Sequence, residues 1–421
     1  MKVIIICIVS EVILFIVWSM YCRYKCPYTA VILTSAEFFL PLVYLPYSVC
    51  APLFFVIERV SLAERYYHIS ERTMMITSII YLIVYALFLL LLFFSRSIEN
   101  VAHRSISWAL DYNFERIPLF FHIFAWLCIL YYAYRIYMAG DTWTGLDTLS
   151  RRAMLSSEYI SYINIYMVAY TNKSIISMLV KKNNPVMAVI KTITPVVFWG
   201  LYLYTTARRY FMLVVPAVAI ALLARKQSIR VSKKWIVGIV ASVTFLLTMG
   251  ARRVFLSLSG TTVVYYLHNT FAEFIYTYYP SCYFVGYKYN LIWGSSYIYD
   301  TITKWIPRAL FPLKPLDLDA VFFQMSGINI SYSFNPIAEG LYNFKWGALI
   351  VVPIILFLFK KVVNYSLKYS SVLYMTFLAA FVGFMRGSLS NSVLDMVMIT
   401  LLMLLMNVHN GKIEIIKHND F

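Results

Sequence analysis

Apolar residues occur in long, almost uncharged runs from one end of this 421-residue chain to the other. A membrane-spanning helix needs about 20 consecutive apolar residues, and most of the runs are close to that length. Spans are predicted near 3–20, 28–57, 73–95, 117–138, 157–180, 185–206, 209–224, 235–251, 346–360, 371–385 and 392–408. Because 28–57 is long and contains three prolines, it predicts either one broken helix or two short segments. The pattern therefore predicts an all-α polytopic integral membrane protein with roughly 11–12 transmembrane helices.

Composition agrees with this class, since 61% of the residues are hydrophobic and only 13% are charged. A soluble chain would carry about a quarter charged residues. The six cysteines lie mostly in or beside the spans, so they do not indicate a disulfide framework. The N-terminal run lacks a small-residue cleavage site and is interpreted as a retained anchor. We expect a single polytopic domain over 1–421.

The positive charges of the chain predict its orientation in the membrane. The loop RKQSIRVSKK at 225–234 carries five Lys or Arg in ten residues and is expected to face the cytoplasm. That choice places a large loop, 252–345, on the outer face. The net charge of +17 lies in short clusters between spans, so it favours a topology signal over nucleic-acid binding.

Arginine dominates the segments predicted to lie outside, whereas lysine dominates those predicted to lie inside. The planar guanidinium group binds phosphate and carboxylate through paired hydrogen bonds, so the outer face is suited to hold an anion. Simple contact with lipid headgroups remains an alternative for each arginine. The arginines at outer span ends are Arg208, Arg209, Arg252, Arg253 and Arg386.

The predicted outer loop 252–345 is dense in tyrosine, as in the run YYLHNTFAEFIYTYYPSCYFVGYKYN. Aromatic faces and polar edges suit a carbohydrate-binding surface. An aromatic belt at the membrane interface explains only a few such residues, so we favour a functional loop, with helices that lie on the membrane as a further possibility.

One carboxylate stands at the boundary between this loop and the next span, in the stretch SYSFNPIAEGLYNFKWGA. Glu339 is expected to orient or deprotonate a substrate hydroxyl if its aromatic neighbours shield it, and otherwise to be a solvated loop acid or the partner of an arginine. Asn335, Tyr342 and Asn343 are expected to bind sugar hydroxyls. His268 and Glu273 are the reserve candidates for the base. Phosphate-loop, zinc-site and esterase motifs are missing, so neither a metal nor a cofactor is expected.

The second half of the chain resembles the Wzy-type oligosaccharide repeat unit polymerases, also called O-antigen polymerases. The resemblance covers 200–421 and rests on TTARRYFMLVVPAVAIALLARK, a span ending in GARR, a Gly-Ser-Ser-Tyr turn, IPRALFPLKP, NPIAEGLYNFKWG and a late FMRG. It implies a glycosyltransferase of the bacterial inner (cytoplasmic) membrane whose active site faces the periplasm. Such enzymes transfer a growing glycan from undecaprenyl diphosphate onto a new lipid-linked repeat unit, within reach of membrane lipids and of a chain-length regulator protein.

Under this resemblance, the expected catalytic residues are Glu339, Arg386, Arg252 and Arg208. The arginines would stabilise the charge that develops on the diphosphate leaving group without a metal. The expected substrate-binding residues are Arg209, Arg253, Arg308, His268, Asn335, Tyr342 and Asn343.

Three other functions remain open at this point. An O-antigen ligase uses the same donor and differs in its acceptor. A lipid-linked oligosaccharide flippase or transporter would show two related halves, which the sequence lacks. A polyprenyl-phosphate-sugar glycosyltransferase would carry an adjacent acidic pair in an early outer loop, and no such pair occurs.

Overall fold

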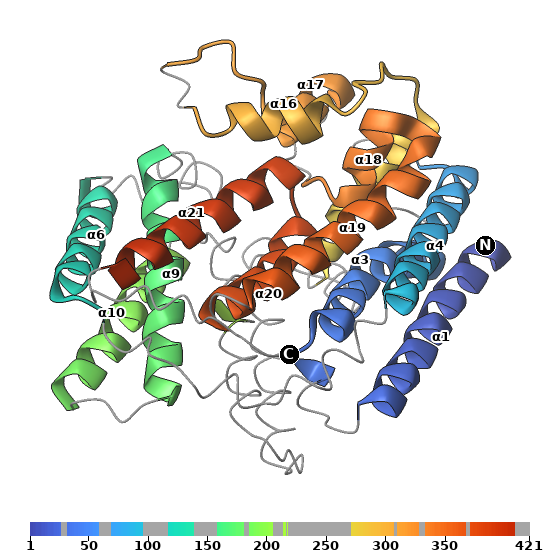
Figure 1. Cartoon of the computed structure of the whole chain (residues 1–421). Helices are drawn as coiled ribbons and strands as arrows, with labels where there is room; N and C mark the ends of the chain where they lie inside the picture. Colours follow the sequence, from blue (N-terminus) through green and yellow to red (C-terminus); the bar gives the residue numbers. More distant parts are fainter. Residues whose placement is uncertain are drawn as a thin grey trace, which may run out of the picture. The chain divides into compact units, whose positions relative to one another are not determined.

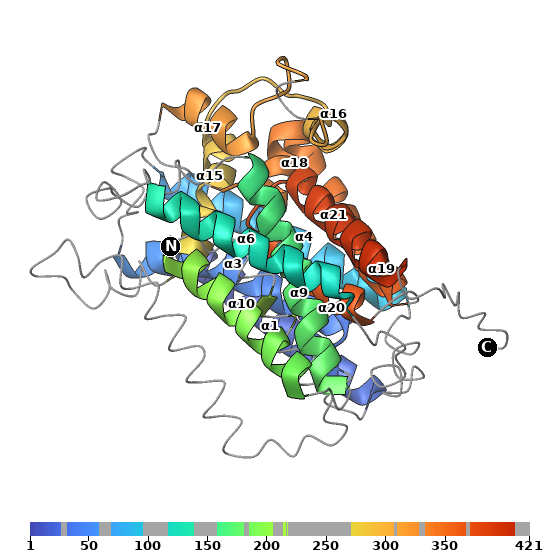
Figure 2. The same cartoon turned by 90° about the vertical axis from the view of Figure 1, so that its left-hand side faces the viewer.

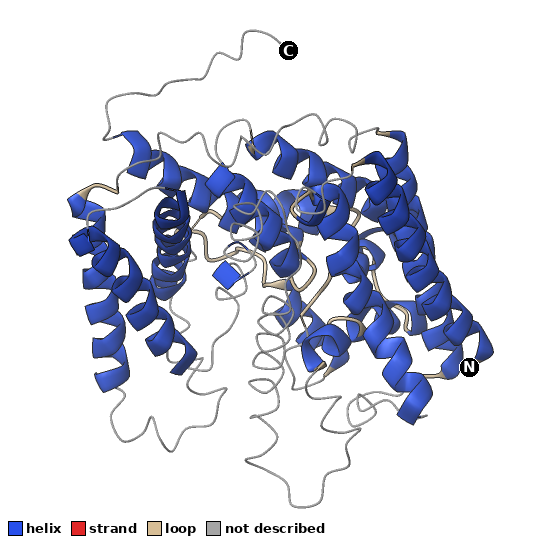
Figure 3. Ribbon diagram, turned by 90° about the horizontal axis from the view of Figure 1, so that it is seen from below, coloured by secondary structure: helices blue, strands red, loops and turns tan. Residues whose placement is uncertain are grey.

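The computed structural model describes residues 1–26, 32–58, 69–95, 117–138, 158–180, 185–204, 214–215, 217, 271–306, 310–327, 333–367 and 371–408. Within these ranges every regular element is a helix (Figures 1 and 3). The longer helices are α1 (Lys2–Lys25), α3 (Ala36–Glu58), α4 (Glu71–Phe94), α6 (Leu119–Met138), α9 (Glu158–Val180), α10 (Pro185–Tyr204), α19 (Ala348–Ser366), α20 (Ser371–Phe384) and α21 (Leu389–Val408). The shorter ones are α14 (Ala272–Tyr276), α15 (Tyr279–Gly286), α16 (Ser295–Thr303), α17 (Leu318–Ser326), α18 (Pro336–Phe344) and the 3-10 helix η3 (Lys345–Gly347).

Seven stretches of helix are long and apolar enough to cross a membrane, counting only the described ranges. They are Lys2–Lys25, Ala36–Ile57, Glu71–Phe94, Leu119–Met138, Pro185–Tyr202, Pro336–Ser366 and Leu389–Met406. This confirms an all-helical polytopic membrane protein. Helix α9 is long enough but less apolar, and α20 is shorter. The predicted spans 209–224 and 235–251 lie outside the described residues except for 214–215 and 217.

The proline-containing stretch that predicted either one helix or two is a single helix, α3. Pro41, Pro46 and Pro52 all lie inside it. Each proline removes one backbone donor from the helical hydrogen bonds, and neighbouring helices in a membrane protein make such positions tolerable. Helix α3 packs against both α1 and α4, which supply that support.

The helices fall into two compact units. Unit 1 comprises Met1–Ser105, Gln227–Val362 and Phe384–Leu394, and unit 2 comprises Ile106–Lys226, Val363–Gly383 and Asp395–Phe421. In unit 1, α1, α3 and α4 lie side by side (Figure 1). In unit 2, α6, α9 and α10 run alongside one another (Figure 2). The single domain expected over 1–421 stays a prediction.

Unit 1 contains ionisable side chains that are buried in its helical core. Lys360 Nζ lies 3.2 Å from Glu37 Oε1, and both side chains are about 1% exposed. Ser48 Oγ donates a hydrogen bond to Glu11, which is 2% exposed. A charge inside a membrane protein is costly unless it is paired or hydrogen-bonded, and these contacts offset that cost.

The described part of the predicted loop 252–345 is mostly helical. Helix α14 packs on α3, and α15 packs on α4 and α18. Tyr278 and Tyr279 are buried, and the ring of Tyr278 stacks on Tyr81 with centroids 4.3 Å apart. For these two residues the expectation of aromatic faces open to sugars is wrong, because both are buried and Tyr278 packs on a membrane helix. A periplasmic position for this segment stays a prediction.

Candidate functional site

The site is organised by α18, which begins at a well-formed N-terminal cap. Asn335 Oδ1 accepts a hydrogen bond of 2.8 Å from the backbone N–H of Ala338, and Pro336 occupies the first turn. Asn335 and Pro336 both suit the start of a helix, where the first backbone N–H groups lack helical partners. The cap fixes where the helix begins and so places Glu339 in the first turn, facing the protein interior.

The Glu339 carboxylate is completely buried and joins three helices. Its Oε1 accepts a hydrogen bond of 2.8 Å from Ser296 Oγ on α16, and its Oε2 accepts one of 2.8 Å from the backbone N–H of Leu389. Leu389 is the first residue of α21, so the carboxylate also lies at the positive end of a helix dipole. The interpretation of Glu339 as a solvated loop acid is therefore wrong, because its side chain is 0% exposed.

The turn that carries Arg386 comes just before α21, whose first residue is hydrogen-bonded to α18. This turn, 385–387, connects α20 to α21, and its last residue is two positions before Leu389. Since the Leu389 N–H binds Glu339, the structure brings the predicted carboxylate and the predicted arginine into the same part of unit 1, 47 positions apart in sequence. Arg386 is half-buried. Its contact with a diphosphate stays a prediction.

The other predicted residues of α18 make contacts within the protein. Asn335 Nδ2 donates to Tyr81 and to the carbonyl of Thr277, and Asn343 Nδ2 donates to Ser296 Oγ and to the carbonyl of Glu339. The Tyr342 ring stacks on Phe284, with centroids 5.1 Å apart. These contacts give the three residues structural roles, and their binding of sugar hydroxyls stays a prediction.

Two buried polar atoms close to Glu339 have no hydrogen-bond partner among the described residues. They are Asn343 Oδ1 and the hydroxyl of Tyr297. A methyl group at Gly340 would lie 3.4 Å from that hydroxyl, so it is adjacent to α18. Buried polar atoms are nearly always satisfied in native proteins, by the protein or by a small polar molecule.

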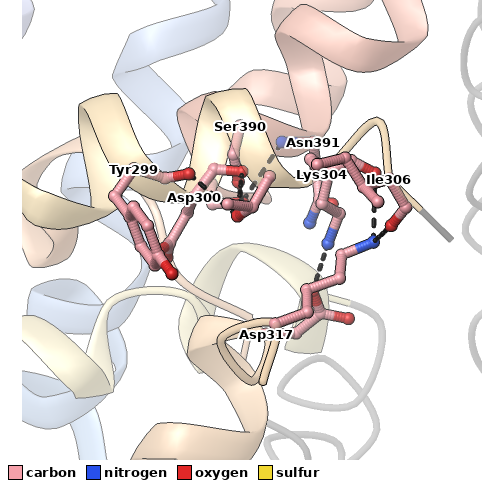
Figure 4. Close-up of polar contacts among 10 residues, drawn as sticks. Tyr299, Asp300, Lys304, Ile306, Asp317, Ser390 and Asn391 are labelled. Atoms are coloured by element: carbon pink, nitrogen blue, oxygen red, sulfur yellow. Dashed lines mark hydrogen bonds and ion pairs between the residues drawn. The ribbon is translucent and has the colours of Figure 1, made fainter. Parts of the chain in front are cut away.

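Asp300 is a carboxylate of this site that sequence reasoning missed. It lies one helical turn after Ser296, so both side chains project from the same face of α16. Figure 4 shows it with Tyr299 of α16, with Lys304 at the C-terminal cap of that helix, and with Ser390 and Asn391 of α21. It lies close enough to Glu339 to interact electrostatically. The spacing of Ser296 and Asp300 was visible in the sequence, but nothing there connected it to Glu339.

Asp300 is half-buried, and its environment favours the protonated form. Burial raises the pKa of Asp300 to about 6; Lys304 opposes this rise and Asp317 adds to it. A carboxyl group with such a pKa exchanges protons readily near neutral pH, which is what a general base requires. Unlike Glu339, Asp300 keeps part of its surface open to solvent.

The C-terminal end of α16 is held by two lysines (Figure 4). Lys304 Nζ forms an ion pair with Asp317, and Lys314 Nζ donates to the carbonyls of Lys304 and Ile306 at 3.1 and 2.8 Å. Cations suit the carbonyl end of a helix, where acceptors lack helical partners. These bonds hold the helix that carries Ser296 and Asp300.

Six of the predicted site residues lie outside the described part of the chain, and their roles stay predictions. They are Arg208, Arg209, Arg252, Arg253, Arg308 and His268. The reserve candidate Glu273 lies on α14. Across the described ranges no group of three or more His, Cys, Asp or Glu residues is placed to hold a metal ion.

No protein-family model, curated protein or solved structure matches this chain. What the site does must therefore be inferred from its own residues. They are a buried carboxylate, a half-buried acid with a raised pKa and an arginine-bearing turn, which meet where short helices join membrane spans.

Proposed function

We propose that this protein is a glycosyltransferase that polymerises undecaprenyl-diphosphate-linked oligosaccharide repeat units at the outer face of a bacterial inner membrane. The sequence resemblance suggests the reaction. The observation that carries the proposal is the position of Glu339, which hydrogen-bonds Ser296 on α16 and Leu389 after the Arg386 turn. Glu339 thus links α16, which carries the proton acceptor Asp300, with the segment that carries the cation Arg386, and the reaction requires both groups.

In this reaction a hydroxyl oxygen of the acceptor sugar attacks the anomeric carbon of the donor glycan. A new C–O bond forms as the C–O bond to the lipid diphosphate breaks, and the electron pair of that bond leaves with the diphosphate. The hydroxyl proton must pass to a base. The reaction therefore needs a base beside the acceptor and positive charge beside the leaving group.

We assign the proton to Asp300 and the orienting role to Glu339. Both Glu339 oxygens already accept hydrogen bonds and the side chain is fully buried, so it is poorly placed to receive a proton from a substrate. Asp300 is partly open and has a pKa of about 6. Glu339 instead fixes Ser296, one turn before Asp300, and with it the orientation of the Asp300 carboxylate.

Arg386 is assigned to the developing negative charge of the diphosphate. Leu389 is held by Glu339, so the turn that carries Arg386 has a fixed position relative to α18. A guanidinium group offers paired donors to phosphate oxygens at no cost in protonation, because it stays charged at all physiological pH values. Arg208 and Arg252 are proposed as further cations for the same group.

Deleting the gene in its host and separating lipopolysaccharide on a gel tests the proposal. Loss of a polymerase leaves core capped with a single repeat unit, and expression of the intact gene restores the ladder. Bare core would instead identify a ligase, and the absence of any surface repeat unit would identify a flippase. An unchanged ladder would refute a role in this polysaccharide altogether.

A further inference from the structure

Helix α16 turns its polar side toward the protein and its apolar side outward. Ile298 and Ile302 lie one turn apart on the outward side, and their side chains are 67% and 63% exposed. Ser296 and Thr303 lie on the other side of the helix and are buried. A surface helix of a soluble protein has the reverse arrangement, with its apolar side against the core. We call Ile298 and Ile302 the α16 apolar face, and such a face needs an apolar environment outside the protein.

The start of α16 is fixed to the end of α18, where the chain enters a membrane span. The backbone N–H of Trp293 donates a hydrogen bond of 3.1 Å to the carbonyl of Asn343. The ring of Tyr297 stacks on Phe344, with centroids 6.0 Å apart. Helix α18 continues through η3 into α19, within the apolar stretch Pro336–Ser366. Helix α16 therefore starts beside the end of a membrane helix (Figure 1).

Two exposed tryptophans occur at the same level of unit 1. Trp293 comes just before α16, and Trp346 lies in η3 beside the exposed Lys345. Tryptophan and lysine at the end of a span are typical of the boundary between lipid chains and headgroups, because each has an apolar part and a polar tip. One turn into α19, Ile350 is exposed, as a lipid-facing residue would be. The tryptophans therefore indicate that α16 starts at the membrane interface.

The C-terminal end of α16 is suited to a place that is poor in water. Thr303 Oγ1 donates a hydrogen bond of 2.8 Å to the carbonyl of Tyr299. Lys314 Nζ donates to the carbonyls of Lys304 and Ile306. The last carbonyls of a helix have no helical partner, and leaving them without one is costly near lipid. In α16 the protein itself supplies donors at this end.

We propose that the α16 apolar face is seated among lipid chains, so that α16 lies in the membrane interface. The sequence left this possibility open for the whole loop 252–345, and the structure assigns it to one helix. Lipid is the occupant that the observations favour, because the face begins beside a span end and beside the tryptophans that mark the interface. A protein partner is the alternative occupant, and the experiment below separates the two.

This seat fixes the depth of the candidate site in the membrane. Asp300 lies on the polar side of the same helix, so a seated α16 holds it at the level of the lipid headgroups. Under the proposed function, the diphosphate of a lipid-linked substrate lies at that level too. The seat itself does not rest on the proposed function, because exposure and packing carry it and its test needs no measurement of activity.

A fluorophore on single introduced cysteines tests the seat in the full-length protein, reconstituted in phosphatidylcholine vesicles. Ile302→Cys carries the fluorophore NBD on the α16 apolar face. Ile350→Cys on α19 is the control for a lipid-facing position, and Gln324→Cys, at an exposed position of α17, is the control for water. Wild type, whose six free cysteines are buried or half-buried, gives the background labelling. Iodide quenches the fluorophore from water, and doxyl-labelled phosphatidylcholine quenches it from the lipid chains.

We expect doxyl-labelled lipid to quench the fluorophore at Ile302→Cys strongly, as it does at Ile350→Cys. Iodide should quench it several-fold less than at Gln324→Cys. Ile298→Cys, one turn earlier on the same face, should give the same pattern. It serves as the second variant if Ile302→Cys does not fold.

Iodide quenching at Ile302→Cys as strong as at Gln324→Cys would overturn the proposal, because the face would then lie in water. Protection from iodide without quenching by doxyl-labelled lipid would overturn it as well. That pattern would assign the face to a protein partner, such as a second copy of this chain. Neither result would bear on the polymerase reaction, which the gene deletion tests separately.

Discussion

Replacing Glu339 by glutamine removes the charge at the centre of the candidate site and preserves the shape of the side chain. The carboxylate accepts hydrogen bonds from Ser296 Oγ and from the Leu389 N–H, both at 2.8 Å. The backbone N–H of Leu389 can only donate, so the glutamine carbonyl must face it and the glutamine NH₂ must face Ser296 Oγ. Only one orientation of the amide therefore satisfies both neighbours.

The expected cost follows from these two bonds. A hydrogen bond to a charged group contributes about 1.5–3 kcal/mol and a neutral one about 0.5–1.5, so two bonds lose roughly 2–3 kcal/mol in total. The easier burial of a neutral amide offsets part of that loss. Folding should therefore survive. If the same 2–3 kcal/mol is lost from the transition state, the transfer rate falls about 30- to 150-fold.

The assay has two readouts for one variant. The length of the polysaccharide ladder in a complemented deletion strain measures polymerisation, and thiol labelling during heating measures folding. We expect Glu339→Gln to give short or absent chains while still unfolding cooperatively, at a midpoint modestly below that of wild type. Asp319→Asn, a matched change on α17 in the same loop, should give full ladders. Full polymerisation by Glu339→Gln across pH 6 to 8 would refute any role of the Glu339 charge in the reaction.

Four further predictions concern the same region. Arg386→Ala should abolish long chains at normal protein levels. Arg386→Lys should restore some of them, because the positive charge returns without the paired donors. Wild-type chain lengths from the alanine variant would show that Arg386 serves only as a topology signal. Leu313→Cys, at an 85% exposed position, should react with an impermeant thiol reagent in intact cells whereas Ser228→Cys should not, and the reverse result would invert the predicted topology. The pKa of Asp300 is raised above its ordinary value, so its contribution to stability is full below pH 4 and is lost as pH rises through about 6, while its capacity to act as a base rises over the same range. Asp300→Asn should remove the pH dependence of both stability and polymerisation. A pH profile of polymerisation that the variant leaves unchanged would exclude Asp300 as the base. In Gly340→Ala the new methyl would lie 2.4 Å from Val352 Cγ2, and this overpacking should lower the unfolding midpoint. Adding Val352→Ala should restore the midpoint, because it removes the clash. A midpoint unaffected by Gly340→Ala alone would contradict the close packing of α18 on α19.

The sequence predicted the helical architecture well where apolar runs are long and separated by polar residues. The predicted spans 3–20 and 73–95 correspond to α1 and α4 within a few residues. Such runs can be identified from composition alone, because a segment of about 20 apolar residues gains free energy when it moves from water into the membrane.

The sequence could not reveal contacts that depend on distant segments. The hydrogen bond between Ser296 and Glu339 joins residues 43 positions apart, and that between Glu339 and Leu389 joins residues 50 positions apart. Asp300 was missed because its importance follows from the first of these bonds. Tyr278 was misinterpreted because a dense row of tyrosines has the same composition on a sugar-binding surface and in a packed core.

The position of Glu339 follows from what α18 must do at the end of a membrane span. Short loop helices bury little apolar surface of their own, so polar contacts with α18 have to orient them. Glu339 fixes α16 and the start of α21, and Asn335 fixes the backbone at Thr277, after α14. Gly340 lets α18 approach α19 where any side chain would collide with Val352. A carboxylate, an amide and a glycine at this boundary thus set the geometry of the candidate site, and substitutions in α18 should change chain synthesis even at positions that never contact a sugar.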